Sequence, residues 1–466
     1  MRGDWSASLP AAWRVDPEVW AARRGWGRVP CGVLRPPDGE AVAEVFRAAQ
    51  RHPAPPASVL VSGGGSQLAR QMAAHPTAGQ GDGAPLWVVD VSAVSGEVEF
   101  SPGNLTLQVP AGIAWEDVAA LLAEQGEGRL VYPIEGPGGA SSTVGGHLAA
   151  NTAGPCSYRY GTARDWALGA ELVAADGRRV RFGRPVMKNV AGYDLTRLLI
   201  GSRGTLGALV RVILRLRPAP PVRRTARLLA PGLAELWPVI RQLKEGPGGP
   251  VAMEACSLWG TSSDEIAWHV GSSQPDKAAR QAASPDPSAH LLQPRAPALA
   301  ALFEYHGPDD ELQEEERRLA SLVAGRAELV WAETGEQERW WSAWRALRSG
   351  LAFAGREGAL PTVARLGVAP GRMPELWEGG QAILADGPAC LAMASPGMGM
   401  LRLLGPPPGA ERWRKLRELA EQLGGYATWE VAPAEGGYEP TPDPAEELSR
   451  ALVRVFDPAG VMRPGL

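Results

Sequence analysis

The stretch Val186-Met-Lys-Asn-Val-Ala-Gly-Tyr-Asp-Leu-Thr-Arg-Leu-Leu-Ile-Gly-Ser-Arg-Gly-Thr-Leu-Gly207 decides the fold that we expect for this chain. It places an aromatic side chain and a carboxylate in one tight turn, Gly192-Tyr-Asp194, and two glycine-spaced turns follow. Glycine is needed where φ is positive or where a ligand touches the main chain, because a Cβ would collide there. The pattern is typical of backbone that closes around a large, flat, anionic ligand.

A first glycine cluster precedes this stretch at Ser62-Gly-Gly-Gly-Ser-Gln-Leu68. It follows the apolar run Ser58–Val61, which we expect to be a buried strand, so its backbone N–H groups are placed to surround phosphate oxygens. A lone glycine loop is weak evidence, and a flexible turn between strand and helix explains it equally well. The loop lacks the G-x-G-x-x-G register of nicotinamide dinucleotide folds, in which Asp90 would be the candidate acidic partner.

A second cluster, Gly136–Gly154, crowds small and hydroxyl-bearing residues at a helix start. The expected hydrogen-bond donors and positions of close backbone approach are Ser141, Ser142, Thr143, Gly145 and Gly146. A surface linker with a helix cap is the weaker alternative, because polar linkers rarely contain an apolar helix start such as Val144–Ala150. For His147 a structural role, a cofactor contact and catalysis all remain open.

A third element, Tyr158–Asp165, lies just before an expected strand. Arg164 and Asp165 have two interpretations: an ion pair that pins the loop, or an arginine that favours negative charge on a reduced cofactor. Lys188 is a second candidate for that last role.

Composition restricts the class of protein. A chain of 466 residues exceeds one hydrophobic core, which predicts two domains. The net charge of −4 gives no basic surface for nucleic acid or membranes, so we expect small molecules or proteins as partners. The four cysteines, at positions 31, 156, 256 and 390, lack metal or disulfide spacing, and no signal peptide or membrane span is evident. A cytoplasmic protein without a metal site fits best.

Apolar periodicity predicts alternating helices and strands. The expected helices are 38–49, 115–125, 147–151, 195–200, 233–244, 311–324, 336–347 and 411–423. The expected strands are 58–61, 86–89, 105–109, 170–174, 179–182 and 208–216, with an Asp176–Gly177 hairpin turn joining two of them. Consecutive prolines in Arg217–Val222 mark the main domain boundary, and the Ser- and Pro-rich stretch 271–297 reads as a flexible insertion.

The order of these motifs resembles the FAD-binding domain of the vanillyl-alcohol-oxidase and p-cresol-methylhydroxylase (PCMH) type, and within it the accessory FAD-binding subunits of bacterial glycolate oxidases. The motifs that carry the resemblance are Ser62–Ser66, Asn104–Gly112, Thr143–Gly146, Tyr160–Asp165, Lys188–Leu195, Gly201–Gly207 and the tail Phe456–Gly465.

The resemblance implies an α+β fold: a two-subdomain PCMH-type FAD-binding domain at 1–218 (subdomains about 30–110 and 111–218), a smaller α/β cap domain at 219–440, and a segment 441–466 that returns to the FAD domain. Ser66 and Gln67 stand where many members attach FAD to a histidine, so we expect non-covalent FAD. The expected FAD-binding residues are Ser62, Gly63, Gly64, Gly65, Ser66, Gln67, Ser142, Thr143, Gly145, Gly146, Asn151, Tyr160, Gly161, Arg164, Asp165 and Gly207.

The resemblance further implies a subunit of a complex that oxidises glycolate or another small 2-hydroxy acid, beside a catalytic flavin subunit and an iron–sulfur subunit through which it could sit at the inner membrane. The H-A-G-D-G-N-type motif of related catalytic subunits is absent, and no catalytic base is evident. One alternative is a self-sufficient FAD dehydrogenase that uses Arg345 or Arg365 for the substrate carboxylate. The other is a non-enzymatic interaction protein that has lost the cofactor.

Overall fold

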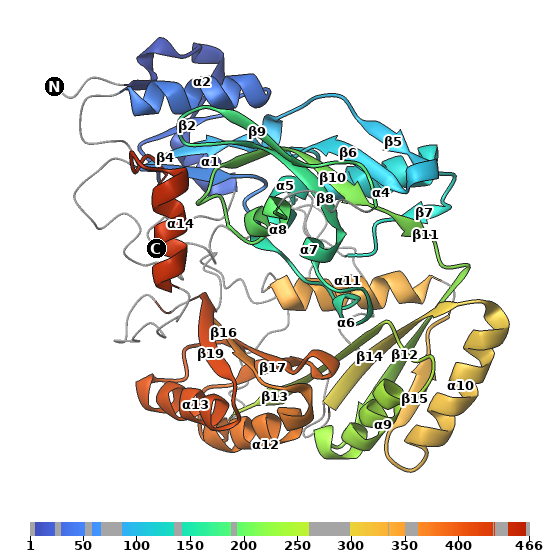
Figure 1. Cartoon of the computed structure of the whole chain (residues 1–466). Coiled ribbons are helices and arrows are strands. Elements are labelled where there is room, and N and C mark those ends of the chain that lie inside the picture. Colours follow the sequence, from blue (N-terminus) through green and yellow to red (C-terminus); the bar gives the residue numbers. More distant parts are fainter. Residues whose placement is uncertain are drawn as a thin grey trace, which may run out of the picture. The chain divides into compact units, whose positions relative to one another are not determined.

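The computed structural model divides the chain into two compact units (Figure 1). Unit 1 consists of Met1–Gly154, Tyr160–Ala219 and Pro442–Leu466, and unit 2 consists of Pro155–Arg159 and Pro220–Thr441. The chain therefore passes into unit 2 at Pro155, returns to unit 1 at Tyr160, and leaves it again after Ala219. The residues that the structure describes are 5–23, 29–51, 58–66, 86–134, 142–187, 193–260, 299–333, 335–349, 362–431, 433 and 446–462.

The first sheet of unit 1 has four strands in the order β1-β2-β4-β3. Strands β2 and β3 both pair with β4 in parallel, and β1 is antiparallel to β2. The strands are β1 (Arg14–Val15), β2 (Gly32–Leu34), β3 (Ser58–Ser62) and β4 (Leu86–Asp90). A parallel arrangement with strand ends at one edge is what brings Ser62 and Asp90 side by side, since these two residues are register partners.

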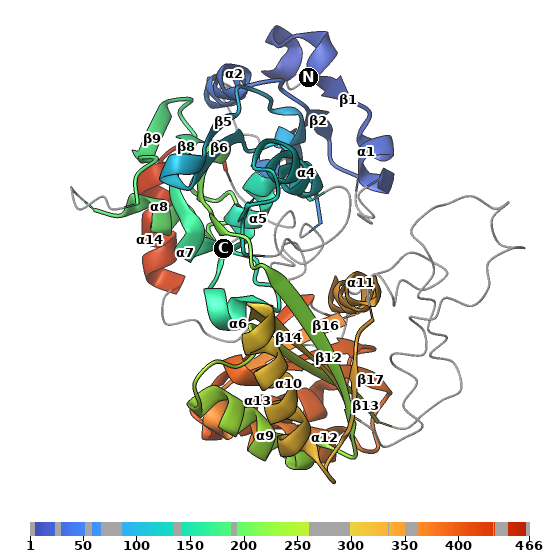
Figure 2. The same cartoon turned by 90° about the vertical axis from the view of Figure 1, so that its right-hand side faces the viewer.

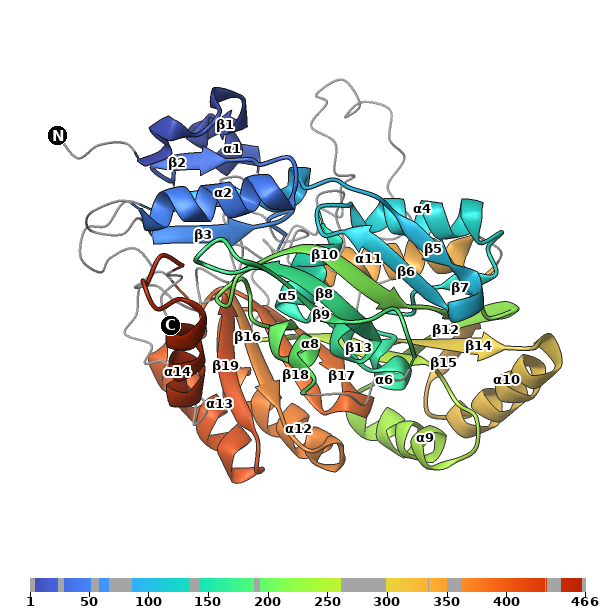
Figure 3. The same ribbon diagram turned by 45° about the horizontal axis from the view of Figure 1, so that its top comes forward.

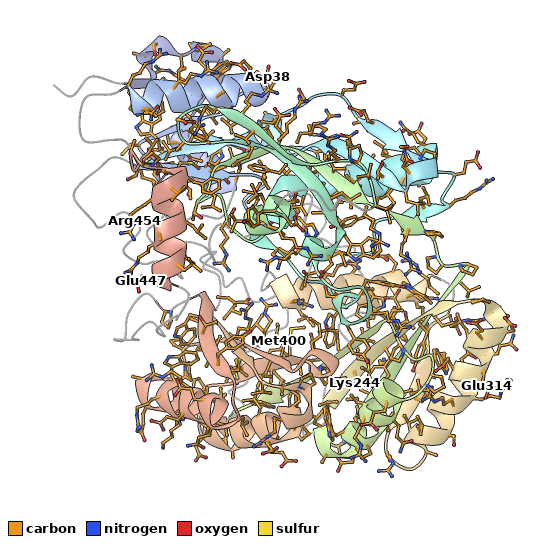
Figure 4. The ribbon with its side chains drawn as sticks, viewed as in Figure 1. Asp38, Lys244, Glu314, Met400, Glu447 and Arg454 are labelled. Carbon is orange, nitrogen blue, oxygen red and sulfur yellow. The ribbon has the colours of Figure 1, made fainter. Side chains whose placement is uncertain are left out.

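Helix α2 (Gly39–Gln50), drawn beside β2 and β3 in Figure 3, packs its apolar side chains against residues of both sheets of unit 1. Its side chains Val42, Val45 and Phe46 are fully buried at helical spacing. Asp38, labelled in Figure 4, caps the helix, because its carboxylate accepts a hydrogen bond from the Ala41 N–H at 2.9 Å. The expected helix at 38–49 is confirmed.

The second sheet of unit 1 is antiparallel, with five strands in the order β5-β6-β10-β8-β9. A tight turn joins β8 to β9, in which Gly177 has φ +78° and Asp176 accepts a hydrogen bond from the Arg178 N–H at 2.9 Å. The expected hairpin is confirmed. The elements are β5 (Glu99–Ser101), β6 (Thr106–Pro110), β8 (Ala167–Val173), β9 (Arg179–Gly183), β10 (Ala208–Arg215), α4 (Trp115–Gln125), α5 (Val144–Ala150), α7 (Ala163–Trp166) and α8 (Leu195–Leu199).

Shorter elements complete unit 1 and the segment that it shares with unit 2. They are the 3-10 helices η1 (Trp5–Ser8), η2 (Ala11–Trp13), η3 (Val91–Ala93) and η4 (Pro102–Asn104), with α1 (Pro17–Arg23), β7 (Leu130–Val131), β11 (Arg217–Pro218) and α6 (Ser157–Tyr160). Strands β7 and β11 pair with each other outside the two main sheets.

The last described segment of the chain is built into unit 1. Helix α14 (Glu446–Phe456), on which Figure 4 labels Glu447 and Arg454, packs Leu452, Val453 and Phe456 against the core beside the second sheet. Beyond it, the Val59 N–H on β3 donates a hydrogen bond to the Val461 carbonyl at 2.8 Å.

Unit 2 is one antiparallel sheet of eight strands in the order β15-β12-β14-β13-β17-β18-β16-β19. Helices α9, α10, α12 and α13 cover one face, and α11 lies across the other (Figures 1 and 2). The strands are β12 (Val222–Ala230), β13 (Ala252–Trp259), β14 (Leu299–Gly307), β15 (Glu328–Trp331), β16 (Thr362–Gly367), β17 (Cys390–Ser395), β18 (Met400–Gly405) and β19 (Tyr426–Val431). The helices are α9 (Leu233–Glu245), α10 (Asp309–Val323), α11 (Glu336–Ser349), α12 (Met373–Leu384) and α13 (Ala410–Gln422), with η8 (Pro370–Arg372) and η9 (Pro396–Met398) beside them.

The expected elements are confirmed with small shifts, and their mixture of helices and mainly antiparallel sheets confirms the α+β class. Helix α5 begins at Val144 rather than at His147, because Thr143 provides the cap. Strand β6 begins at Thr106, since Leu105 has a left-handed φ of 54°. Helices α12 and α14 were not expected, and the insertion 271–297 lies outside the described residues. Among the described residues, no helix is long and apolar enough to cross a membrane.

Substitution of Asp457 is expected to lower the stability of the protein. Its carboxylate is 4% exposed and accepts hydrogen bonds from the backbone N–H groups of Val461 at 2.9 Å and Met462 at 2.6 Å. The substitution Asp457→Ala leaves both buried donors without their acceptor, so we expect a loss of about 2 to 4 kcal/mol in the free energy of unfolding.

Urea denaturation followed by tryptophan fluorescence measures this loss. Glu418→Ala, on the exposed surface of α13, is the matched control and should change stability by less than about 0.5 kcal/mol. Equal stability of Asp457→Ala and the wild type would contradict the assignment.

Candidate functional site

The first glycine loop and the start of α5 meet at the hydroxyl of Thr143. This oxygen accepts a hydrogen bond from the Gly146 N–H at 3.2 Å, as a helix cap, and another from the Gly64 N–H at 3.4 Å. A Cβ on Gly63 would lie 2.4 Å from the same oxygen, so only glycine fits there. Two clusters that are distant in the sequence thus form one surface of closely approaching backbone.

The helix start is also fixed from the other side, by the chain after β6. The Gly145 N–H donates to the Ala111 carbonyl at 2.8 Å, and a Cβ on Gly145 would lie 2.7 Å from the Cβ of Ala111. Trp115 N–H in turn donates to the Ser142 carbonyl at 2.8 Å. The expected positions of close backbone approach in this cluster are therefore real constraints of the fold.

The stretch that ends at Gly207 joins the same surface through its second half. Gly201 has φ +94° and donates its N–H to the Leu148 carbonyl at 3.2 Å, and a Cβ on Gly204 would contact Val61 at 3.2 Å. Gly207 has φ +142°, and a Cβ there would lie 2.6 Å from the Val173 carbonyl oxygen. These three glycines pack against α5, β3 and β8, so the structure brings all three clusters together.

In the first half of that stretch, the described residues form the start of helix α8. Asp194 caps α8 by accepting a hydrogen bond from the Arg197 N–H at 3.2 Å, and its other oxygen lies 3.1 Å from the Arg197 guanidinium. The Tyr193 side chain is 94% exposed. The described part of this turn is therefore a helix start, and Lys188 and Gly192 lie outside the described residues, as do Gln67 and Ser141.

Arg164 and Asp165 do not pair with each other as one interpretation expected. The Arg164 guanidinium donates to the Ile200 carbonyl at 2.9 Å, and its backbone N–H donates to Asn151 Oδ1 at 3.1 Å. The Asp165 carboxylate caps α7 through the Thr162 N–H at 2.9 Å. Arg164 therefore links Asn151, in the second glycine cluster, to the residue after α8, whereas Asp165 holds the start of its own helix. Any contact of either residue with FAD stays a prediction, as it does for Asn151.

Tyr160 and Gly161 form the turn before α7. Gly161 has φ +83°, and a Cβ there would lie 2.6 Å from Asp165 Oδ2. The Tyr160 carbonyl accepts a hydrogen bond from the Trp166 indole at 2.7 Å. The centre of the Tyr160 ring lies 4.4 Å from the Arg217 guanidinium.

An aromatic cluster beside this surface was not expected from the sequence. The ring of Trp115 lies 4.6 Å from that of His147 and 5.2 Å from that of Tyr132. His147 Nδ1 forms a short hydrogen bond with the Thr152 hydroxyl. Burial lowers the pKa of His147 to about 3, and burial raises the pKa of Tyr132. The imidazole is therefore neutral at physiological pH.

Three buried polar atoms here have no hydrogen-bond partner within the described part of the chain. They are the Ser142 hydroxyl, the Tyr132 hydroxyl and His147 Nε2. Buried polar groups normally have a partner, and a partner supplied by a ligand is one solution. Together with a backbone cradle that a Cβ would fill, these atoms fit a polar cofactor such as FAD.

Asp90, the acidic residue that a nicotinamide site would require, is already engaged. It is 1% exposed and accepts hydrogen bonds from the Trp20 indole at 2.8 Å and the Ser92 N–H at 2.9 Å. A ribose would have to displace the indole, which argues against the nicotinamide alternative.

The geometry of this site agrees with an FAD binding domain. Residues 30–183 match the family model described as "FAD binding domain", which covers the first two glycine clusters and the loop around Tyr160. FAD is therefore the cofactor that the domain indicates.

The chain is also similar in sequence to several known proteins. The chain is 32% identical over 216 residues to D-2-hydroxyglutarate dehydrogenase of Xanthomonas citri pv. viticola, covering 46% of this chain and 43% of that protein. It is 32% identical over 197 residues to glycolate oxidase subunit GlcD of Bacillus subtilis (42% and 39% covered), and 38% identical over 133 residues to subunit GlcE of Escherichia coli (28% and 37% covered). The chain thus matches less than half the length of these relatives.

A solved structure shares the fold over nearly the whole chain. An alkyldihydroxyacetonephosphate synthase superposes with a TM-score of 0.65 at 15% identity, covering 94% of this chain and 77% of that one. At this identity the likeness shows the fold alone.

Thr143 is the residue whose loss tests the site most directly. Thr143→Val keeps the shape of the side chain but removes the acceptor shared by Gly64 and Gly146, so we expect a loss of about 1 to 2 kcal/mol in stability and weaker retention of FAD. Thr143→Ser keeps the hydroxyl and should behave like the wild type. Thermal melting and the flavin-to-protein absorbance ratio measure both effects; full FAD retention and unchanged stability in Thr143→Val would contradict this role.

The lowered pKa of His147 predicts that the stability of the folded protein decreases as the pH falls. Its folded pKa of about 3 lies below the value of about 6.5 expected in the unfolded chain, so the unfolded chain binds the extra proton first. Stability from this group is complete above about pH 6.5 and is lost as the pH falls toward 3. Between pH 6.5 and 5 we expect the wild type to lose about 2 kcal/mol more than His147→Gln. Urea denaturation at both pH values, without FAD, measures this difference; parallel losses in the two proteins would refute it.

Proposed function

We propose that this chain is an FAD-binding subunit of a complex that oxidises glycolate or a related 2-hydroxy acid. The observation that carries the proposal is the single surface formed by the three glycine clusters around Thr143, within a region that matches an FAD binding domain. Relatives named as subunits of glycolate oxidase support the substrate class and the membership of a complex.

Several residues of the candidate site would contact FAD in such a protein. The backbone of Gly63–Gly65 and Gly145–Gly146 would hold the phosphates, and Ser142, Tyr132 and His147 would supply polar partners to bound FAD. When bound, FAD supplies a two-electron acceptor for the oxidation. Because His147 is neutral, its Nε2 would act as a hydrogen-bonding group rather than as a cation.

A partner subunit would remove the hydroxyl proton of the substrate. Oxidising glycolate to glyoxylate removes a hydride from the carbon and a proton from the hydroxyl, which requires a base. The second half lacks the histidine motif of related catalytic subunits. Within the described residues no group of His, Cys, Asp and Glu is arranged to hold a metal ion, so an iron–sulfur subunit would bring the clusters.

A second candidate is a self-sufficient FAD dehydrogenase, which the relative named D-2-hydroxyglutarate dehydrogenase favours. Of its two proposed carboxylate-binding residues, Arg345 pairs with Glu338, a mostly exposed carboxylate, on the same helix. Arg365 instead lies on β16 in a partly buried cluster with Glu430. The Arg345 side chain is 24% exposed and that of Arg365 35%, so both remain candidates.

Purification of the tagged full chain from its native cells tests the proposal. We expect a yellow protein whose flavin is released by acid as free FAD, accompanied by a second flavoprotein and a cysteine-rich iron–sulfur protein. The purified chain alone should not bleach its flavin when glycolate or D-lactate is added.

Three outcomes would contradict the proposal in different ways. Bleaching by the isolated chain favours the self-sufficient dehydrogenase. A colourless chain that added FAD does not reconstitute favours an interaction protein that has lost the cofactor. Flavin that stays with the acid-precipitated chain contradicts non-covalent attachment.

A further inference from the structure

Helix α14 has apolar side chains that unit 1 does not cover. Leu452, Val453 and Phe456 pack against the core beside the second sheet. Two other large apolar side chains of the same helix remain in solvent, since Leu448 is 65% exposed and Val455 is 75% exposed. A single exposed apolar residue is ordinary, but two on one short helix suggest a face that another molecule covers.

The two exposed apolar residues project from the same face of the helix. They are seven residues apart, which is about two helical turns, so one side chain lies above the other along the helix axis. Ala451 lies between them at helical spacing, and its small side chain allows a second helix to approach closely. Leu448, Ala451 and Val455 are the apolar row of α14.

A charged row runs beside the apolar row. Glu447 and Arg454 are also seven residues apart, and each directly precedes a member of the apolar row in the sequence. Both side chains are exposed, and Figure 4 labels them on the same side of the helix. A glutamate near the start of a helix and an arginine near its end also complement the helix dipole. The dipole explains the two charges but not the exposed apolar row next to them.

The two rows are complementary to themselves. In an antiparallel pair of α14 helices, a two-fold axis beside Ala451 places Leu448 of one copy against Val455 of the other. The same rotation places Glu447 against Arg454 of the other copy, because both rows reverse about nearly the same point of the helix. In a parallel pair each charge would instead meet its own copy, which is unfavourable.

We propose that the apolar and charged rows of α14 bind a second copy of this chain, as an antiparallel helix pair with two-fold symmetry. The occupant is a second copy because both rows find their complement on the same helix. A pair of helices with three turns each buries less than the roughly 1,200 Å² of a stable interface, so we expect a weak dimer, with a dissociation constant of about 1 to 100 µM. This association goes beyond the proposed function and requires neither FAD nor another subunit.

Sedimentation velocity of the purified full chain tests the inference. The wild type should change from monomer to dimer between about 1 and 300 µM. Val455→Asp places a charge from each copy in the apolar contact, so we expect association at least tenfold weaker. Val455 is exposed in the single chain, so the variant should fold like the wild type, and thermal melting checks this. A wild type that stays monomeric at every concentration overturns the inference.

Charge reversal tests the partner and its orientation. Glu447→Arg and Arg454→Glu each set like charges against each other at both ends of the pair, so each variant alone should dimerise about tenfold more weakly. An equimolar mixture of the two variants restores opposite charges at both ends and should dimerise as well as the wild type. Arg450→Glu is the matched control, because it makes the same change of charge on α14 but is turned farther from the apolar row; it should leave association unchanged.

Two further results would overturn the inference. Dimers that tolerate both charge reversals and Val455→Asp are held together by another surface. A mixture that dimerises no better than its separate components shows that Glu447 and Arg454 do not face each other. Flavin absorbance should be the same in the variants and the wild type, because none of these residues belongs to the surface around Thr143, so association and FAD binding are measured independently.

Discussion

The hydroxyl of Thr143 is the interaction on which the cofactor surface depends. One oxygen accepts hydrogen bonds from Gly64 and Gly146, and so holds the loop after β3 against the start of α5. Positive φ values and close contacts at Gly201, Gly204 and Gly207 then bring the third glycine cluster onto the same helix and strands. The surface is made of backbone, which explains why it needs glycines, and why sequence patterns reveal it so readily.

Unit 2 shows the opposite case, because its charged cluster is made of side chains that the sheet brings together from distant strands. Arg365, Arg402 and Glu430 belong to three strands with separate places in the sequence, and only the register of the ladder makes them neighbours.

Sequence reasoning found most of the longer helices and six strands of unit 1, because their apolar periodicity and caps are local. It placed none of the eight strands of the unit 2 sheet. It did not find α12, whose Gly379 and Gly380 interrupt the pattern but allow Leu419 and Trp259 to pack closely. It placed the glycine clusters but missed the aromatic cluster around His147, since Trp115 and Tyr132 approach that ring only through tertiary packing. The expected Arg164–Asp165 ion pair was wrong, because the Arg164 guanidinium donates to the Ile200 carbonyl and the Asp165 carboxylate caps its own helix, α7.

The hydrogen bond from Val59 to Val461 has a consequence for how the protein is made. Strand β3 leads into the first glycine loop, yet one of its backbone contacts comes from a residue near the other end of the sequence. Folding during synthesis favours units whose contacts are near in the chain. Most residues of unit 2 therefore leave the ribosome before unit 1 is complete, and a fully assembled flavin surface is expected only after residue 462 has emerged.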